Sequence, residues 1–544
     1  MNWEAFKAAI QEQGDVPHEN WYILGIDLGT TNSVISYWCN SGQKPESIDI
    51  SNGFGKIPLP SVVQFRKGDG GNPDEWVIGE EAYRSMKIYP ETTIRSIKRK
   101  MGTNETIRLG GTDYLPEEIS AKILRELVDH VHALNPNAEI AGLCVSVPYD
   151  FDDSAKKATR RAVALAGLED KLICLIEEPK AAALAYNFRS QLTLGEKILV
   201  FDFGGGTLDI TLFQVSEKDD ERIKLQVISE GGEAYHGGDN IDEAILEKCY
   251  ELIRTKTGSC ELAPENQAEL IARAREVKER LSGVKNFRIP FTFCIPPFVE
   301  QLTREQFEEL NRNFISKTRK LVLKALRECY IGPVSADSID RVLLEGGSSQ
   351  MPWVKEMLTD IFGSEDKIYT SEKPALDISI GATYYAAMKM GVLGSPDVES
   401  ERMGPKVEFE VTAPHDIGLE VESGGKKMFF TMIRRGTPYA LAKKSHIFTL
   451  SGDNPADMTT FELKILERIN KEDPIEACKL IGEVVINGLP SRPSGKTKLR
   501  ITLTAQEEAG LVRGSVEDLG FAGEFEPSGF KEDFDPGRFA KVEL

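Results

Sequence analysis

Residues 198–213 read I-L-V-F-D-F-G-G-G-T-L-D-I-T-L-F, and residues 23–38 read I-L-G-I-D-L-G-T-T-N-S-V-I-S-Y-W. In both stretches an apolar run ends at an aspartate, a turn rich in glycine or threonine follows, and a second β-prone run begins. Glycine lets the backbone come close to a ligand, and successive N–H groups in such a turn bind an anion. One copy alone would more often be an ordinary hairpin turn. Because the pattern occurs twice, it predicts two facing hairpins that hold the phosphates of a nucleotide.

Asp27 and Asp202 end the apolar runs of the two hairpins. A carboxylate repels a phosphate, so we expect each aspartate to orient a hydrated cation that lies between it and the phosphates. The sequence therefore predicts that Asp27 and Asp202 hold a divalent cation through water molecules.

Composition and charge exclude several classes of protein. The chain has 544 residues, 41% hydrophobic and 28% charged, as expected for a folded protein with several domains. Its net charge is −20, from 66 basic and 86 acidic residues. Nucleic acids and anionic membranes bind basic faces, so neither is an expected partner. The eight cysteines show no metal-site or disulfide spacing, and we expect buried free thiols.

The two ends of the chain bear on its location. Residues 1–14 read M-N-W-E-A-F-K-A-A-I-Q-E-Q-G, with acids and no apolar core, so we expect no signal peptide. No run reaches the ~18 apolar residues of a transmembrane span. The final K-V-E-L resembles an endoplasmic-reticulum retrieval signal, which we interpret as a coincidence. These observations predict a cytoplasmic protein.

Strands and helices alternate along most of the chain, as in an α/β architecture. Helices are expected at 116–134, 153–168, 181–186 and 265–282, the last of them strongly charged. The apolar residues predicted on one face of the first helix are Ile119, Ile123, Leu127, Val128, Val131 and Leu134.

Glycine, proline, serine and alternating charges interrupt this pattern near residues 391–408, as in a linker. Beyond it, Leu499, Ile501 and Leu503 alternate with polar residues, as in a half-exposed strand. We therefore divide the chain into an N-terminal extension (1–20), an α/β nucleotide-binding domain (21–392), a linker (393–410), an antiparallel β-sandwich (411–520) and a tail (521–544).

The chain resembles the heat-shock 70-kDa (DnaK-type) chaperone family over residues 21–520, through seven motifs in one order. They are I-D-L-G-T-T-N-S at 26–33, I-K-R at 97–99, V-P at 147–148, E-P at 178–179, D-F-G-G-G-T-L-D at 202–209, H-G-G-D at 236–239 and L-L-E-G-G-S-S-Q-M-P at 343–352. The resemblance implies an α/β actin-like (duplicated ribonuclease-H-like) ATPase domain followed by a β-sandwich peptide-binding domain. It also implies ATP and ADP as ligands, with Mg²⁺ and K⁺ as the ions.

The resemblance also implies the residues of an ATPase site. Lys98 matches the lysine that contacts the γ-phosphate and the attacking water, where its charge would stabilise the transition state. A Lys-Arg pair is usually a surface feature, and only the I-K-R-K-M-G context assigns Lys98. Glu178 and Thr207 complete the catalytic set with Asp27 and Asp202. The nucleotide-binding residues implied are Gly29, Thr30, Thr31, Asn32, Gly204, Gly205, Gly206, Thr207, Gly237, Gly238, Lys278, Ser282, Gly346, Gly347, Ser348 and Gln350.

The sequence departs from the family pattern at the base site. Many members hold the adenine between two arginines, whereas Glu279 and Gln350 stand at those positions here, with Arg280 adjacent. Lys180 replaces the threonine that follows E-P. We therefore expect weaker adenine binding than in a relative with both arginines.

Further departures concern coupling between the domains. Pro148 matches the switch proline that passes the nucleotide state to the linker, but V-E-F-E at 407–410 places acids where the family linker carries leucines. Cys174 stands where an arginine binds J-domain partners. The resemblance implies client polypeptides, J-domain proteins and nucleotide-exchange factors as partners, and these substitutions put the co-chaperones in question.

The resemblance of the β-domain is weaker. It implies a peptide pocket lined by Leu419, Phe448, and Phe461 or Met458, although each would serve equally well as sandwich core. Ser423 replaces a methionine that arches over the groove, and the helical lid of the family is missing from the sequence. Phe521, Phe525, Phe530, Phe534 and Phe539 recur in the tail; they predict either a strap packed on the sandwich or a phenylalanine that occupies the groove.

These observations favour an ATP-dependent chaperone that binds extended segments of unfolded proteins. The alternative is a nucleotide-regulated adaptor with little ATP turnover and one dedicated protein partner. A sugar kinase of the same fold is a third possibility, and the second, all-β domain argues against it.

Overall fold

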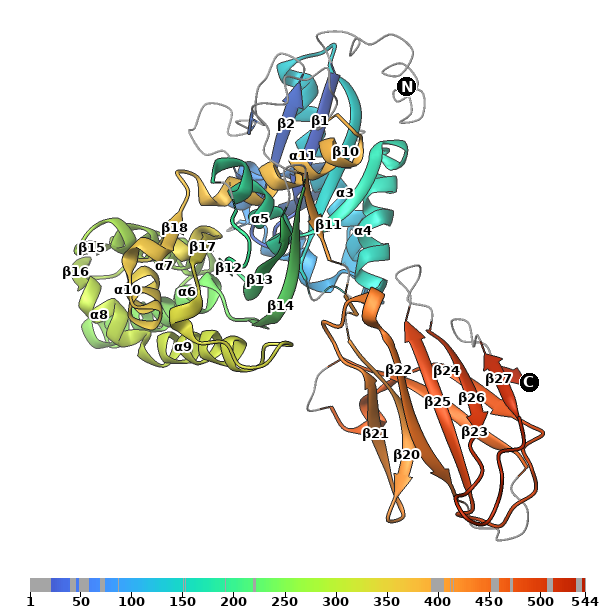
Figure 1. Ribbon diagram of the computed structural model, residues 1–544. Coiled ribbons are helices and arrows are strands. Elements are labelled where there is room, and N and C mark those ends of the chain that lie inside the picture. Colours follow the sequence, from blue (N-terminus) through green and yellow to red (C-terminus); the bar gives the residue numbers. More distant parts are fainter. Residues whose placement is uncertain are drawn as a thin grey trace. The chain divides into compact units, whose positions relative to one another are not determined.

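The fold is described from a computed structural model (Figure 1). The structure describes all residues except 1–20, 40–45, 48–57, 69–73, 87, 150, 152, 191, 219–221, 393–405, 411, 414, 452–458, 470–472, 506–511, 535–540 and 544. The predicted N-terminal extension, most of the predicted linker, Met458 and Phe539 therefore lie outside the described residues.

The chain divides into two compact units. Unit 1 contains Met1–Leu225, Glu230–Glu328 and Val334–Glu408, and unit 2 contains Phe409–Leu544 with two short segments, Gln226–Ser229 and Cys329–Pro333. Each unit is described by itself below.

The first half of unit 1 is built on a sheet with the strand order β11-β10-β1-β2-β3, in which β4 also pairs with β2. β1 is parallel to β10 and antiparallel to β2, and β10 is parallel to β11. These strands are β1 (Trp21–Asp27), β2 (Asn32–Cys39), β3 (Glu46–Ser47), β4 (Leu59–Pro60), β10 (Glu139–Val147) and β11 (Leu172–Glu177). The first predicted hairpin is thus β1–β2, with its turn at residues 28–31.

The second half of unit 1 repeats this pattern of pairing in a sheet with the order β18-β17-β12-β13-β14-β19. β12 is parallel to β17 and antiparallel to β13, and β17 is parallel to β18. The strands are β12 (Lys197–Phe203), β13 (Thr207–Lys218), β14 (Arg222–Ala234), β17 (Arg341–Glu345), β18 (Ile368–Thr370) and β19 (Lys406–Phe409). The second predicted hairpin is β12–β13.

Alternate residues of β1 face the two sides of its sheet. Leu24 and Ile26 are fully buried in a core shared with the helices α3 (Pro116–Leu134) and α4 (Asp153–Leu165). Gly25 points the other way, where a side chain would collide with α11 (Asp377–Lys389) at Ser379 and Thr383. Helix α11 packs against β1 and against α5 (Glu178–Arg189), so helices cover both faces of the sheet.

The helices predicted from the sequence are present, with small differences at their ends. α3 buries the predicted apolar face except at Leu134, which is 65% exposed at the C-terminal end of the helix. The charged segment 265–282 lies in α7 (Pro264–Gly283), where ion pairs one turn apart satisfy its charges.

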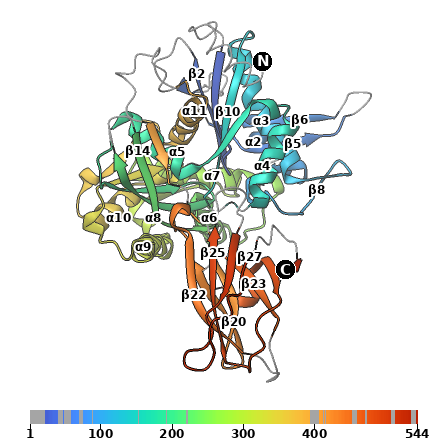
Figure 2. The same cartoon turned by 45° about the vertical axis from the view of Figure 1, so that its right-hand side comes forward.

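Smaller elements complete unit 1. β5 (Val62–Arg66), β6 (Glu75–Ile78) and β7 (Thr93–Arg95) form a sheet beside α2 (Glu80–Ser85) and α3, as Figure 2 shows for β5 and β6. The remaining elements are β8 (Ile107–Leu109), β9 (Thr112–Tyr114), α6 (Gly238–Thr257), β15 (Asn286–Phe291), β16 (Phe298–Thr303), α8 (Arg304–Leu310), α9 (Arg312–Arg327), α10 (Pro352–Phe362) and the short 3₁₀ turns η2 (Ile97–Lys100) and η5 (Gly347–Gln350).

Unit 2 contains two β-sheets around one apolar core. The first has the order β21-β20-β23-β24-β28 and the second β22-β25-β26-β27. The strands are β20 (Asp416–Ser423), β21 (Lys426–Ile433), β22 (Lys443–Leu450), β23 (Phe461–Arg468), β24 (Lys479–Ile486), β25 (Thr497–Ala505), β26 (Val512–Asp518), β27 (Lys531–Phe534) and β28 (Lys541–Glu543). In β25, Leu499, Ile501 and Leu503 point into the core, as their alternation predicts.

Strands continue past residue 520, into the segment interpreted from the sequence as a tail. β27 pairs with β26 along one sheet, and β28 pairs with β24 along the other. Phe534 is 3% exposed in the sandwich core, and Phe530 packs against that core. Phe521 lies over Lys496, and Phe525 lies over Arg492. These contacts agree with the strap and account for four of the five phenylalanines without placing any of them in the predicted groove.

All eight cysteines are free thiols, as expected from their spacing. Cys39, Cys174, Cys260 and Cys478 are only partly buried, however, so the expectation of burial holds for the other four.

Candidate functional site

The two hairpin turns line one cleft in unit 1. A cavity of about 120 Å³ is bounded by both turns, by the 3₁₀ turn η2 and by the N-terminus of α5. The sequence-predicted residues that line it are Asp27, Gly29, Thr30, Thr31, Asn32, Lys98, Pro148, Glu178, Asp202, Gly204, Gly205, Gly206, Thr207, Gly346 and Gly347. The fold thus brings together residues that are up to 320 positions apart, from Asp27 to Gly347.

Lys98 is the central cation of the cleft. Its side chain is 5% exposed, and its ammonium donates a hydrogen bond to Glu178, the first residue of α5. Burial disfavours the charged ammonium, but the carboxylates of Glu178 and Asp27 more than offset that cost and raise the pKa of Lys98. A charged lysine held among acids is not a surface Lys-Arg pair, and it is available to neutralise a phosphate.

The two aspartates are buried among negative charges. Burial and the nearby Glu178 raise the pKa of Asp27 to about 6, although Ser146 donates a hydrogen bond of 2.8 Å to its Oδ1. Burial, Glu178 and Asp27 raise the pKa of Asp202 well above its usual range. Both carboxylates are therefore destabilised as anions in the protein alone, which is the electrostatic condition that a bound cation relieves.

The donor set fits a hydrated Mg²⁺. Asp27 and Asp202 offer hard oxygen ligands on the same cavity, where the buried Oγ1 of Thr31 also lacks a hydrogen-bond partner. Among the residues that the structure describes, no three Asp, Glu, His or Cys side chains are grouped closely enough to ligate one ion directly.

Backbone N–H groups at the N-terminus of α6 hold two carbonyls of the second turn in place. The backbone N–H groups of Gly238 and Asp239 donate to Gly204 and Gly205, at 3.1 and 2.7 Å. A side chain at Gly237 would collide with the backbone of Gly205 and Gly206. Gly237 and Gly238 therefore lie behind the turn and support it, at the N-terminus of α6.

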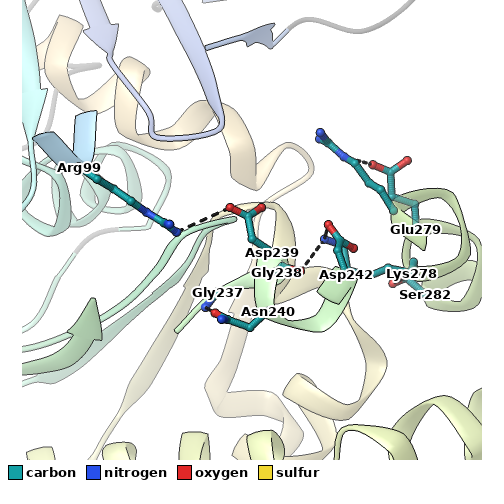
Figure 3. A network of polar contacts seen from close by, with 10 residues as sticks. Arg99, Gly237, Gly238, Asp239, Asn240, Asp242, Lys278, Glu279 and Ser282 are labelled. Atoms are coloured by element: carbon teal, nitrogen blue, oxygen red, sulfur yellow. Dashed lines mark hydrogen bonds and ion pairs between the residues drawn. The ribbon is translucent and has the colours of Figure 1, made fainter. Parts of the chain in front are cut away.

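A larger cavity of about 1,090 Å³ adjoins the cleft and contains the predicted base site. Lys278, Ser282, Gly347, Ser348 and Gln350 line it together with Glu279 and Arg280. The ammonium of Lys278 donates hydrogen bonds to Asp242 at 2.8 Å and to the Gly238 carbonyl at 3.0 Å. Figure 3 shows Lys278 beside Gly238, Asp242 and Ser282.

Sequence reasoning missed two residues of the cavity that contains the predicted base site. Arg275 and Tyr83 line the cavity; the Arg275 guanidinium lies 5.3 Å from the Tyr83 ring centroid and donates to Glu279 at 3.1 Å. The spacing of four residues between Arg275 and Glu279 on a helix was the available signal. Tyr83 offered none, because its proximity depends on packing between the two halves.

The structure gives the neighbours of Lys180, Cys174 and the linker, where the sequence departs from the family pattern. Lys180 pairs with Glu177 at 2.7 Å. Cys174 lies beside Cys144 in the pairing of β11 with β10. The described part of the linker, β19, is the edge strand next to β14.

In unit 2, the inner faces of two edge strands are partly uncovered. In β22, Lys444, His446 and Phe448 are opposite the core residues Leu503, Ile501 and Leu499 of β25. This register places the three side chains on the core side of the sheet, where we expect burial. Lys444 and His446 are nevertheless exposed, and Phe448 is half-buried. The opposite sheet therefore leaves the inner face of β22 partly uncovered.

Three ring side chains lie together on this partly uncovered surface, which we name the β21–β22 groove after the predicted peptide site and define by Phe430, His446 and Phe448. The Phe430 ring lies 4.5 Å from His446 and 5.0 Å from Phe448. Leu419 is fully buried beneath, so it belongs to the core and not to the groove surface, and Phe461 packs half-buried against the same core. Of the predicted peptide-binding residues that the structure describes, Phe448 alone lies on the groove.

The unit 1 cleft, with two turns lining one cavity between α/β halves, is typical of a class of nucleotide-binding α/β proteins, and it is joined here to a β-sandwich. The family model described as "Hsp70 protein" matches residues 23–107 and 103–520. The chain belongs to the Hsp70 family and is accordingly an ATP-hydrolysing, ATP-dependent chaperone. The family implies an actin-like ATPase domain and a β-sandwich.

Three relatives, each named "Chaperone protein DnaK", illustrate the similarity. The protein of Thermotoga maritima is 32% identical over 511 residues, which cover 92% of this chain and 78% of the relative. That of Thermosipho africanus is 31% identical over 512 residues, with the same coverage. That of Mycoplasmopsis synoviae is 32% identical over 507 residues, covering 91% and 77%. These names favour the chaperone over the adaptor alternative.

No helix among the described residues has the length and apolar character needed to cross a membrane.

Proposed function

We propose that this chain hydrolyses ATP in the unit 1 cleft and thereby controls the binding of an extended polypeptide segment in the β21–β22 groove. The observation that supports the first part most strongly is Lys98, a buried cation between two phosphate-binding turns. The uncovered inner face of β22 supports the second part, since an edge strand offers backbone hydrogen bonds to an extended chain.

Within the cleft, we assign the γ-phosphate to Lys98, and the β- and γ-phosphates to the two turns that contain Thr30, Thr31 and Gly204–Thr207. Lys98 would share its charge between Glu178 and the phosphoryl oxygens as negative charge develops on them. Glu178 would in turn orient the attacking water. Mg²⁺, held through water by Asp27 and Asp202, would supply charge neutralisation of the phosphates.

The finer architecture belongs to the same proposal. The shared pairing pattern of the two sheets in unit 1 supports a duplicated ribonuclease-H-like arrangement. We assign residues 21–392 to the nucleotide-binding domain, 393–410 to the linker and 411 onward to the sandwich, with Pro148 as the switch between nucleotide and linker. K⁺ is a second candidate ion, and unfolded polypeptides, J-domain proteins and exchange factors are the candidate partners.

The deciding experiment measures ATP turnover with and without a panel of unfolded peptides. Stimulated turnover in the wild type, lost in Lys98→Ala, is the expected result. Intact ATP binding with no turnover under any condition would contradict the proposal.

A matched pair of variants tests the groove. Phe448→Ala should weaken peptide binding, whereas Ile447→Ala should not, because Ile447 is more accessible than Phe448, at 49% exposure, but points to the outer face of the same strand. Equal losses in the two variants would place the peptide elsewhere.

A further inference from the structure

The residue after Lys98 connects the two halves of unit 1. Arg99 belongs to the same 3₁₀ turn, η2, in the half built on β1. Its Nη2 donates a hydrogen bond of 3.0 Å to the carbonyl of Gly206, in the second phosphate turn of the other half. The same Nη2 lies 3.6 Å from Asp239 Oδ2, an ion pair that Figure 3 shows. One short turn thus presents a lysine to the cleft and an arginine to the opposite half.

Arg99 completes a set of donors to the glycine carbonyls. Gly204 and Gly205 accept from the backbone N–H groups of Gly238 and Asp239, which belong to the same half as the turn. Gly206 accepts from Arg99, which belongs to the other half. In a trans peptide the carbonyl and the following N–H point in opposite directions. Fixing the Gly206 carbonyl therefore fixes the direction of the Thr207 N–H.

The guanidinium of Arg99 occupies the space that a side chain at position 206 would need. The φ of Gly206 is not in the positive range, so the backbone itself does not require glycine. A Cβ added there would lie 2.5 Å from Nη2 and 3.0 Å from Nε of Arg99, and its three nearest atoms all belong to that guanidinium. Arg99 also lies 4.9 Å from the ring centroid of Tyr235, a non-glycine residue with φ of 62°.

We propose that Arg99 is a positioning residue that couples closure of the two halves to the phosphate-binding form of the second turn. When the halves are together, Arg99 holds the Gly206 carbonyl away from the phosphates. When they separate, this carbonyl loses the donor that the other half supplies, and the turn loses its fixed shape. Arg99 also anchors η2 independently of Lys98, so the turn stays in place when Lys98 shares its charge with a phosphate. This inference rests on the proposed ATPase site.

A double-mutant cycle tests the coupling. Gly206→Ala and Arg99→Ala should each weaken ATP binding and slow single-turnover hydrolysis. For Arg99→Ala the two effects together should amount to roughly 10- to 100-fold, as for the loss of a hydrogen bond from a charged donor. The double variant should be no worse than Arg99→Ala, because the added methyl then meets no guanidinium. Additive losses would overturn the proposal, since Gly206 would then be required for another reason.

Binding of adenosine separates positioning from general loosening of the fold. Arg99→Ala should bind adenosine with unchanged affinity while ATP affinity falls, because the base site contacts neither Gly206 nor η2. Equal losses for the two ligands would contradict a role at the phosphates. Arg99→Lys, which keeps the charge but not the planar fork, should restore part of the loss and provides the test if Arg99→Ala does not fold.

Lys100→Met is the matched control. Lys100 ends the same turn, but its side chain is 48% exposed and pairs with Glu105 at 2.9 Å, away from the second turn. It should keep wild-type turnover; a loss equal to that of Arg99→Ala would show that any charge on η2 matters. If the wild type binds no ATP, the proposed function fails; if it does and the cycle is additive, only the role of Arg99 fails.

Discussion

The cleft of unit 1 and the groove of unit 2 are built in opposite ways. In the cleft, charged side chains are buried and paired with one another, as Lys98 is with Glu178. In the groove, Lys444 and His446 have positions that should be core, yet they are exposed. Buried charges need partners and are costly to leave alone, whereas exposed polar side chains such as Lys444 and His446 are solvated at little cost. The cleft is therefore a preorganised electrostatic site, and the groove is an adaptable surface.

Lys98→Ala should have the largest effect in this comparison. Removing the cation from the cleft leaves charge on the transferring phosphoryl group without a partner, so we expect kcat to fall roughly a hundredfold or more. Peptide affinity measured without nucleotide should not change, because the groove does not contain Lys98. Single-turnover hydrolysis and fluorescence anisotropy of a labelled peptide measure the two effects. Unchanged kcat would remove Lys98 from the catalytic set.

Arg492→Ala tests a strongly buried ion pair of the sandwich. Arg492 and Asp518 side chains are 5% and 0% exposed and form two hydrogen bonds, at 2.7 and 2.9 Å. Breaking such a pair leaves a buried charge and costs about 3–5 kcal/mol of unfolding free energy. Calorimetry should show the sandwich transition falling while the unit 1 transition stays in place.

Arg500→Ala is the control for that variant. Arg500 pairs with Glu517 on the neighbouring strand, but their side chains are 44% and 38% exposed. An exposed pair contributes about 0–1 kcal/mol. Equal losses in the two variants would show that burial does not decide the strength of these pairs.

Asp27→Asn should separate function from stability in the cleft. Burial and the nearby Glu178 raise the pKa of Asp27 to about 6, so the carboxylate is destabilised as an anion. A neutral amide does not carry this cost, and we expect the unfolding free energy of the nucleotide-free protein to rise by about 1–3 kcal/mol. ATP turnover should be lost with the cation ligand. Thermal unfolding without nucleotide, together with turnover, measures both changes. A less stable variant would mean that Asp27 has a structural role that its charge does not explain.

The sandwich should also show a distinct dependence on pH. Burial disfavours the Asp518 carboxylate, but hydrogen bonds from Arg492, Ser528 and Gly520 outweigh it and hold its pKa well below the usual range. A lowered pKa means that this contribution to stability is complete above the pKa of an unfolded aspartate, about 3.9, and declines as the pH falls below it. Unfolding free energies measured between pH 6 and pH 2 should therefore fall less steeply in Arg492→Ala than in the wild type.

Gln350→Arg should produce the smallest change, at the base site. An arginine on an adenine face contributes about 0.5–2 kcal/mol, so ATP should bind up to roughly thirtyfold more tightly. Gln350 is an exposed residue of the cavity wall and the substitution should leave the fold intact. Calorimetric titration with ATP measures the gain; no gain with an intact fold would place the base away from Gln350.

The two hairpin turns of the cleft were predictable because their sequence pattern is local. Each apolar strand, its terminal aspartate and the turn after it lie within a few consecutive residues, so Asp27, Asp202, Gly204 and Thr207 could be assigned to one cavity before any contact was known. The helix at Pro116 and the strand at Leu499 were predictable for the same reason, since helix and strand periods are properties of neighbouring residues.

Three features depended on tertiary contacts. The sequence pattern did not reveal the strand pairing of residues 531–534, because a short polar strand is recognised only by the edge of β26 that it covers. It did not reveal that Leu419 is core while Phe448 is accessible, because both alternate in the same way along their strands. The pairing of Arg275 with Tyr83 was also hidden, since it joins residues from different halves of unit 1.

The sequence by itself determined the two hairpin turns of the cleft, their aspartates, four of the helices of unit 1 and the family, because these follow from backbone conformation and from motifs in a fixed order. The tertiary structure decided which charges are buried together, which inward positions of β22 stay exposed, and that Arg99 contacts the second hairpin turn from the opposite half. Burial and long-range pairing set the pKa of Asp27 and the partner of Lys98. They depend on the packing of segments that are distant in the chain, which no local pattern specifies.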